Sequence, residues 1–86
     1  MPYNIEYHKD FIKFLKKHQD IQAKVFESFE TIAQNPYEAK LDIKKLQGRA
    51  NHYCLRISKY RFLYEVLENE ILIYAYKADS RGDIYK

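Results

Sequence analysis

Residues 53–78, YCLRISKYRFLYEVLENEILIYAYKA, decide the fold of this chain. Every second residue from Tyr53 to Ile57 is apolar, which is the period of a strand with one buried face. The two-residue turn Ser58-Lys59 leads into a second strand, from Tyr60 to Leu67. After an acidic turn, the run from Ile71 to Ala78 is apolar on both faces for most of its length, which indicates a strand inside the sheet.

The residues before this region predict one more strand and two helices. Tyr3, Ile5 and Tyr7 alternate with polar residues, so they predict a first strand. From Phe11 to His18 the apolar side chains recur at helical spacing, with lysines on the other side, as in an amphipathic helix. Asp20 is a suitable N-cap for a second helix, and Asn35-Pro36 ends it, because the residue before a proline avoids the α region.

The predicted order is therefore β-α-α-β-β-β. It defines an α+β fold in which a helical hairpin packs on one face of a mostly antiparallel four-stranded sheet. A length of 86 residues fits a single domain, residues 1–86. A chain this short has a thin core, and the nine tyrosines and five phenylalanines supply large side chains to fill it.

Composition excludes several classes of protein. The one cysteine, Cys54, cannot form a disulfide within the chain, and no Cys/His cluster has zinc spacing. The first ten residues contain no apolar segment typical of a secretion signal. The longest apolar run, Ile71 to Tyr76, is far shorter than the ~20 residues that span a bilayer. We therefore expect a protein of the reducing cytoplasm, with no membrane contact, metal or cofactor.

The net charge of +3 is unevenly distributed along the chain. Residues 40–61 contain seven basic residues and a single acidic one, whereas the segments on either side are slightly acidic. A basic block of this kind is the usual footprint of a polyanionic partner. A solvated charged surface without a partner is the alternative.

Four residues form a candidate active site for RNA cleavage. Arg56 and Arg61 belong to adjacent antiparallel strands joined by a tight turn, so they can lie close together. Arg81 and Tyr85 come from the tail that follows the last strand. Arginine suits the stabilisation of a phosphorane, because its planar fork matches phosphate and stays charged. A phenol near arginines has a lowered pKa, which favours proton transfer, and its ring can stack on a base.

Structural roles for the same residues remain open at this stage. Arg56 and Arg61 can instead pair with Glu65 or Glu68, and Tyr85 can simply anchor the tail. His52, just before the Arg56 strand, is a second candidate for acid–base work. Glu65 can act as a base, although an ion pair is its more common role. Cys54 lacks an activating arrangement and is interpreted as non-catalytic.

Three segments resemble one known family: LDIKKLQG at 41–48, HYCLRISKYRFLYEV at 52–66 and SRGDIYK at 80–86. They are similar to the RelE/ParE superfamily of bacterial and archaeal toxins, and more closely to its RelE-like branch. The resemblance covers nearly the whole chain. It implies a fold like that of the microbial ribonucleases, metal-independent cleavage of mRNA in the ribosomal A site, and a small RelB-like antitoxin that wraps and silences the toxin.

The resemblance also implies roles for individual residues. Arg61 matches the phosphate-binding arginine, Arg56 a basic strand residue, and Arg81 with Tyr85 the tail pair. The predicted RNA-binding residues are Lys44, Lys45, Arg49, Tyr53 and Lys59. Two other functions stay open: a ParE-like toxin that binds gyrase, and a degenerate member that only binds its antitoxin.

Overall fold

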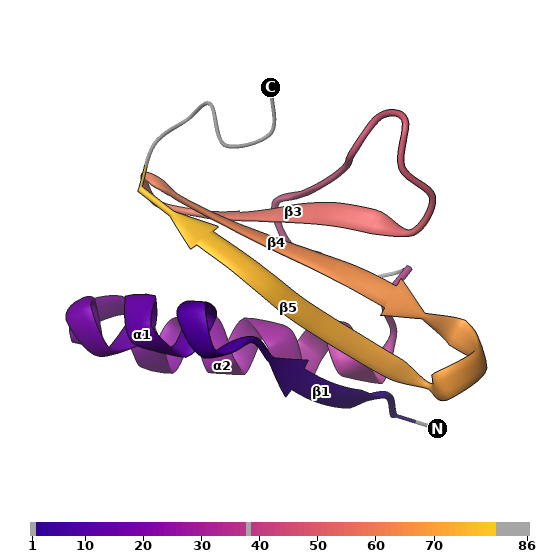
Figure 1. The fold of residues 1–86 in the computed structure, drawn as a ribbon, viewed down its shortest axis with the longest axis horizontal. Coiled ribbons are helices and arrows are strands. Elements are labelled where there is room, and N and C mark those ends of the chain that lie inside the picture. Colours follow the sequence, from indigo (N-terminus) through magenta and orange to yellow (C-terminus); the bar gives the residue numbers. More distant parts are fainter. Residues whose placement is uncertain (1, 38, 81–86) are drawn as a thin grey trace.

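The computed structural model describes residues 2–37 and 39–80, and Figure 1 shows their arrangement. In chain order the elements are β1 (Asn4–Tyr7), α1 (Lys9–Lys17), α2 (Gln19–Gln34), β2 (Ile43–Lys45), β3 (His52–Ile57), β4 (Tyr60–Leu67), the 3₁₀ turn η1 (Glu68–Glu70) and β5 (Leu72–Asp79). The predicted strand and helix segments are all present within a residue or two of their expected ends.

The described strands form one sheet in the order β1-β5-β4-β3-β2. β1 pairs in parallel with β5, and the other neighbouring strands are antiparallel. β5 thus lies between β1 and β4, which confirms that the apolar run at its position is an interior strand. Both helices lie along one face of this mixed sheet (Figure 1), so the predicted α+β class is confirmed.

The sheet differs from the prediction by one strand, because β2 adds a fifth strand at the edge. β2 pairs with β3, and Ile43 lies opposite Leu55. It has only three residues, one of them apolar. A segment this short cannot display the alternation by which strands are recognised, so its identity depends on the neighbouring strand that it pairs with.

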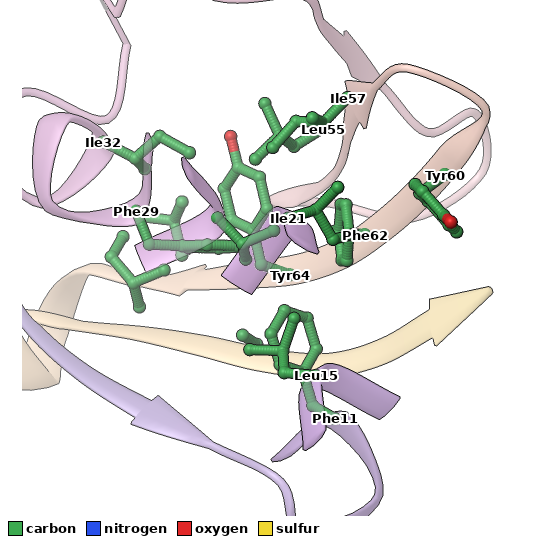
Figure 2. Packing of buried hydrophobic residues seen from close by; sticks show 14 residues of the cluster. Phe11, Leu15, Ile21, Phe29, Ile32, Leu55, Ile57, Tyr60, Phe62 and Tyr64 are labelled. Atoms are coloured by element: carbon green, nitrogen blue, oxygen red, sulfur yellow. The ribbon is translucent and has the colours of Figure 1, made fainter. Parts of the chain in front are cut away.

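The core lies between the helices and the sheet. Each helix contributes an apolar stripe: Phe11 and Leu15 of α1 are completely buried, as are Val25, Phe29 and Ile32 of α2. These side chains meet buried residues of β3, β4 and β5 in one cluster. Figure 2 shows the ring of Tyr64 inside this cluster, between α2 and the strands. Aromatic side chains are among the largest residues of this cluster, as the composition predicted.

The helix ends follow the sequence with one correction. α2 ends at Gln34, just before Asn35-Pro36, as predicted. Its N-cap, however, is His18 and not Asp20, which lies in the first turn. The prediction was wrong because α1 and α2 are separated by one residue, which caps both helices. His18 stacks on Phe14, with ring centroids 4.1 Å apart, and its Nδ1 lies 2.9 Å from the Phe14 carbonyl oxygen.

The strand register divides the side chains between two faces of the sheet. The opposed pairs Leu55–Phe62 and Ile57–Tyr60 point into the helix-covered core. The pairs that alternate with these along the ladder, His52–Glu65, Cys54–Leu63 and Arg56–Arg61, therefore point to the other side. We call this second side the helix-free face. Neither described helix is long and apolar enough to cross a membrane.

Candidate functional site

Arg56 of β3 and Arg61 of β4 lie directly opposite each other on the helix-free face. They flank the tight Ser58-Lys59 turn, where Ser58 has a positive φ of 56°. Opposed residues of an antiparallel pair have Cβ atoms about 4.5–5.5 Å apart. The structure therefore brings together the two arginines that the sequence assigned to one site, and two like charges at this spacing favour an anion between them.

Arg56 is held by a neighbouring acid. Its Nε lies 3.1 Å from Oδ2 of Asp42, and its backbone N–H donates to the Asp42 carbonyl oxygen at 2.8 Å. Asp42 precedes β2, so the edge strand positions the carboxylate beside the guanidinium. Sequence reasoning considered Glu65 and Glu68 as partners and missed Asp42. The sequence contained an indication of this pairing, because Asp42 is the one acidic residue within the basic block 40–61.

Arg61 has a different environment. Its Nε is buried and has no hydrogen-bond partner among the described residues. A buried N–H without a partner costs about 1–3 kcal/mol. An arginine bears this cost when its partner is a ligand and not a group of the folded chain itself. Arg56 is thus oriented by the protein, and Arg61 retains an unused donor.

The next pair along the β3–β4 ladder on the helix-free face is apolar. Cys54 and Leu63 are opposed, and both are buried although they belong to the helix-free face. Burial raises the pKa of the Cys54 thiol, and this outweighs the opposite influence of Arg61 and Arg56. The thiol is therefore held in its unreactive protonated form. This environment agrees with the interpretation of Cys54 as a non-catalytic residue.

The predicted RNA-binding residues occupy several regions of the structure. Lys44 lies opposite Cys54 and so belongs to the helix-free face. Lys59 is exposed at the turn, with its Nζ 5.7 Å from the centroid of the Tyr60 ring. Arg49 lines a shallow hollow formed by residues 45–50. Lys44 thus shares a face with the Arg56–Arg61 pair, and Lys59 lies in the turn that joins the strands of the two arginines.

Lys45 and Tyr53 lie on the other side of the sheet. They are opposed in the β2–β3 ladder, one residue out of phase with Lys44 and Cys54. Tyr53 stacks on Tyr64, with ring centroids 5.6 Å apart, and packs against the core. The structure does not bring these two residues to the Arg56–Arg61 pair. Arg81 and Tyr85 lie outside the described residues.

A third group on the helix-free face surrounds His52. Its Nδ1 is 2.8 Å from the Ala50 carbonyl oxygen, and its Nε2 is 3.8 Å from Oε1 of Glu65. The His52 ring meets Tyr76 edge-on, with centroids 5.7 Å apart. Tyr76 is two residues from Tyr74 and shares its face of the sheet, and it is skipped in the β4–β5 register, where Tyr64 pairs with Ala75 and Leu63 with Lys77. Strand periodicity can place Tyr76 on this face, but it gives no indication of a contact with a residue of β3.

No group of three or more His, Cys, Asp or Glu side chains in residues 2–37 and 39–80 is arranged to hold a metal ion. Besides the carboxylates of Asp42 and Glu65, the described part of the site offers guanidinium, ammonium, imidazole and phenol groups. Guanidinium groups bind and neutralise phosphate, and imidazole transfers protons near neutral pH.

Comparison with known proteins identifies the class. The family model described as the ParE toxin of the type II toxin–antitoxin system parDE matches residues 5–81. A Methanocaldococcus jannaschii protein with the provisional name toxin RelE1 is 39% identical over 88 residues, which cover 100% of this chain and 98% of that protein.

Solved structures agree with these matches. The archaeal RelE–RelB complex from Pyrococcus horikoshii superposes with a TM-score of 0.82 at 25% identity, covering 96% of this chain and 99% of that one. The RelB–RelE antitoxin–toxin complex from Methanococcus jannaschii gives a TM-score of 0.71 at 32% identity, covering 92% and 93% of the two chains.

The fold, the basic helix-free face and these relatives define a toxin of a type II toxin–antitoxin system. The chain belongs to the RelE/ParE toxin superfamily, and within it to the RelE family. The resemblance found in the sequence is thereby confirmed.

Proposed function

We propose that this toxin is a metal-independent endoribonuclease that cleaves mRNA in the A site of the ribosome. The observation that carries the proposal is the Arg56–Arg61 pair, in which Arg61 has a buried Nε–H without a partner among the described residues. A phosphodiester supplies the anion that such a pair lacks, and it accepts the planar fork of a guanidinium. On this proposal the protein acts in the cytoplasm, where its substrate is found.

The proposed reaction is a transesterification in which a general base accepts the proton of the 2′-OH and a general acid supplies one to the leaving oxygen. The 2′-OH of one nucleotide loses its proton and attacks the adjacent phosphorus, and the bond to the 5′-oxygen of the next nucleotide breaks. That oxygen takes up a proton, which leaves a 2′,3′-cyclic phosphate and a free 5′-OH. Arg56 and Arg61 would neutralise the charge that develops on the phosphorane oxygens, where fixed donors act most strongly.

The remaining roles in this proposal come from the resemblance. Arg81 would add a third cation at the phosphate, and Tyr85 would stack on a base or transfer a proton. Lys44, Arg49 and Lys59 would hold the RNA backbone on the helix-free face. Lys45 and Tyr53 lie on the opposite side, so we propose them only as contacts at the β2 edge.

Mapping of mRNA cleavage on programmed ribosomes tests the proposal. The wild type is expected to cut the message at the A-site codon, and Arg61→Ala to reduce the rate by about 100-fold or more, the usual effect of removing a transition-state donor. Arg81→Ala tests the tail in the same assay. Lys24→Ala removes an exposed charge from α2, on the far side of the sheet, and should leave the rate unchanged. Intact messages with the wild type would refute the proposal.

A gyrase-binding toxin is the second candidate, because the matching family model is that of the ParE toxins. Such a toxin would poison DNA replication and leave transcripts whole, so the same induction experiment separates the two. A member that only binds its antitoxin would cause neither effect. Growth arrest with cleaved messages is the outcome expected from the arginine pair.

The proposed partner is a small RelB-like antitoxin. Similar RelE chains from Pyrococcus horikoshii and Methanococcus jannaschii were crystallised in complex with RelB antitoxins. We propose that an antitoxin of this kind folds over the present chain and covers the basic helix-free face, as disordered segments commonly do when they bind. Co-expression of the adjacent reading frame should restore growth. Failure of the product to co-purify with the toxin would argue against this partner.

A further inference from the structure

A second cluster on the helix-free face has the composition of a nucleobase site. The rings of His8, Tyr74, Tyr76 and His52 form a continuous row from the N-cap of α1 over β5 to β3. Successive ring centroids are 6.4, 6.1 and 5.7 Å apart. All four residues are partly exposed. Partly exposed aromatic rings on a sheet are the usual platform for unstacked bases of single-stranded RNA.

Glu65 adds a hydrogen-bonding edge to this platform. It lies opposite His52 on one side and opposite Tyr74 on the other, so it sits in the middle of the row. Its side chain is 30% exposed. The Nε2 of His52 is 3.8 Å from Oε1 of Glu65, which is too long for a hydrogen bond. Both atoms therefore face the same space without satisfying each other.

The hydrogen bond between His52 Nδ1 and the Ala50 carbonyl determines whether the other ring nitrogen, Nε2, is a donor or an acceptor. The Ala50 carbonyl oxygen, 2.8 Å from Nδ1, can only accept, so Nδ1 carries the proton. In the neutral ring Nε2 is then an acceptor, as are the carboxylate oxygens of Glu65. A base that binds here must offer two neighbouring donors. Guanine does so through N1–H and the N2 amino group, whereas adenine, cytosine and uracil each place an acceptor beside their donor.

The position of the cluster suits a nucleotide bound at the arginine pair. His52 and Glu65 are each four residues from Arg56 and Arg61 along β3 and β4. At about 3.3 Å per residue the two sites are about 13 Å apart on one face. Burial raises the pKa of Tyr76, Arg49 opposes this shift and Glu65 adds to it. Arg49, in the loop before β3, is therefore also close to Tyr76. A backbone held by Arg49 and the arginine pair would pass the cluster.

We propose that His52, Glu65, Tyr74 and Tyr76 form a guanine-selective base subsite, where the tyrosines stack on the base and His52 and Glu65 accept its N1–H and N2–H. This inference rests on the proposed action on RNA and adds the base class that the toxin selects. Repulsion of phosphate by Glu65 adds selectivity, because it leaves the base edge as the only part of a nucleotide that fits beside the carboxylate.

Binding of short 2′-O-methyl RNA tests the subsite without cleavage or ribosomes. The probes carry one guanine, adenine, cytosine or inosine in a uracil background, and fluorescence anisotropy is read at one fixed salt concentration. We expect the guanine probe to bind the wild type at least about fivefold more tightly than the adenine, cytosine and all-uracil probes, the effect of one paired base contact. Inosine, which lacks the N2 amino group, should fall between them.

Two variants and one control test whether Glu65 and His52 cause the guanine preference. Glu65→Gln replaces an acceptor by a donor at constant shape, and His52→Phe keeps a ring but removes Nε2. Each should reduce the guanine preference to within about twofold while the all-uracil probe binds as before. Glu27→Gln, which removes an exposed carboxylate of α2, should retain the full preference.

Equal binding of all four bases by the wild type, or an unchanged guanine preference in Glu65→Gln, would overturn the inference. The inosine comparison uses only the wild type, so it is valid even if a variant fails to fold. The outcomes also separate the two proposals. If the toxin prefers guanine probes but does not cleave mRNA, only the nuclease proposal is refuted. If it cleaves mRNA and Glu65→Gln leaves the cleavage sites unchanged, only the subsite proposal is refuted.

Discussion

The two opposed arginines should respond to the same substitution with opposite changes in stability. Arg61→Met keeps the length of the side chain but removes the buried Nε–H that has no partner among the described residues. Arg56→Met removes an Nε that is paired with Asp42 at 3.1 Å. The two residues are opposed in one antiparallel ladder, so the same replacement compares two adjacent sites of the sheet.

The expected magnitudes follow from these environments. An unsatisfied buried donor costs about 1–3 kcal/mol, so Arg61→Met should raise the free energy of unfolding by about 1–2 kcal/mol after some loss of packing. The ion pair of Arg56 is 44% exposed on the arginine side and 61% on the aspartate side. Exposed pairs contribute about 0–1 kcal/mol, so Arg56→Met should lower the same free energy by less than about 1 kcal/mol.

Equilibrium unfolding in urea, followed by circular dichroism, measures both changes. With an m-value near 1 kcal/mol per molar urea, Arg61→Met should shift the midpoint upward by about 1–2 M. Arg49→Met, the same replacement in the exposed loop, serves as the control and should change stability by less than about 0.5 kcal/mol. A midpoint for Arg61→Met at or below that of the wild type would show that Nε is satisfied in solution, and the reasoning would fail.

Three further predictions use other features of the structure. Tyr64→Phe removes a buried hydroxyl without a partner among the described residues, so it should raise stability by about 1 kcal/mol in urea unfolding, whereas Tyr37→Phe at an exposed site should not. The contribution of Tyr7 to stability should be constant up to about pH 10 and be lost above it, because burial, followed by the charge of Glu30, raises the pKa of Tyr7 to about 12. The folded state then holds the proton more tightly than the unfolded state, so Tyr7→Phe should reduce the fall of the urea midpoint between about pH 10 and about pH 12. Asp42→Asn frees the Arg56 guanidinium and removes a negative charge, so the affinity for short RNA should rise about two- to fivefold at fixed salt.

The parts of the fold that could be predicted are those with a clear hydrophobic period. The alternation in β3 and the apolar run of β5 each fix an element from local sequence alone, and both were found where expected. β2 was missed because three residues carry too little pattern. The N-cap of α2 was misplaced because His18 serves two helices at once, a property of the junction and not of any single motif.

Some features of the candidate site could also be predicted from the sequence, and others could not. The proximity of Arg56 and Arg61 follows from a two-residue turn, which dictates the register of the strands on either side. The separation of Lys45 and Tyr53 from that pair also follows from the register, but only once β2 is known to be a strand. The contact of Tyr76 with His52 could not be predicted, because it joins β5 to β3 across β4 and so depends on the register of two strand pairs, one of them irregular.

The unequal environments of the two arginines bear on how an antitoxin could control this toxin. Asp42 already occupies Arg56, so an acidic side chain that approached it would replace one carboxylate by another with little gain. Arg61 has a buried donor that no described residue satisfies, so the first carboxylate or phosphate to reach it removes a cost of about 1–3 kcal/mol. On the proposed function, RNA and antitoxin therefore compete chiefly for Arg61. An antitoxin segment that places one carboxylate there would exclude RNA by mass action, without any change in the fold of the toxin.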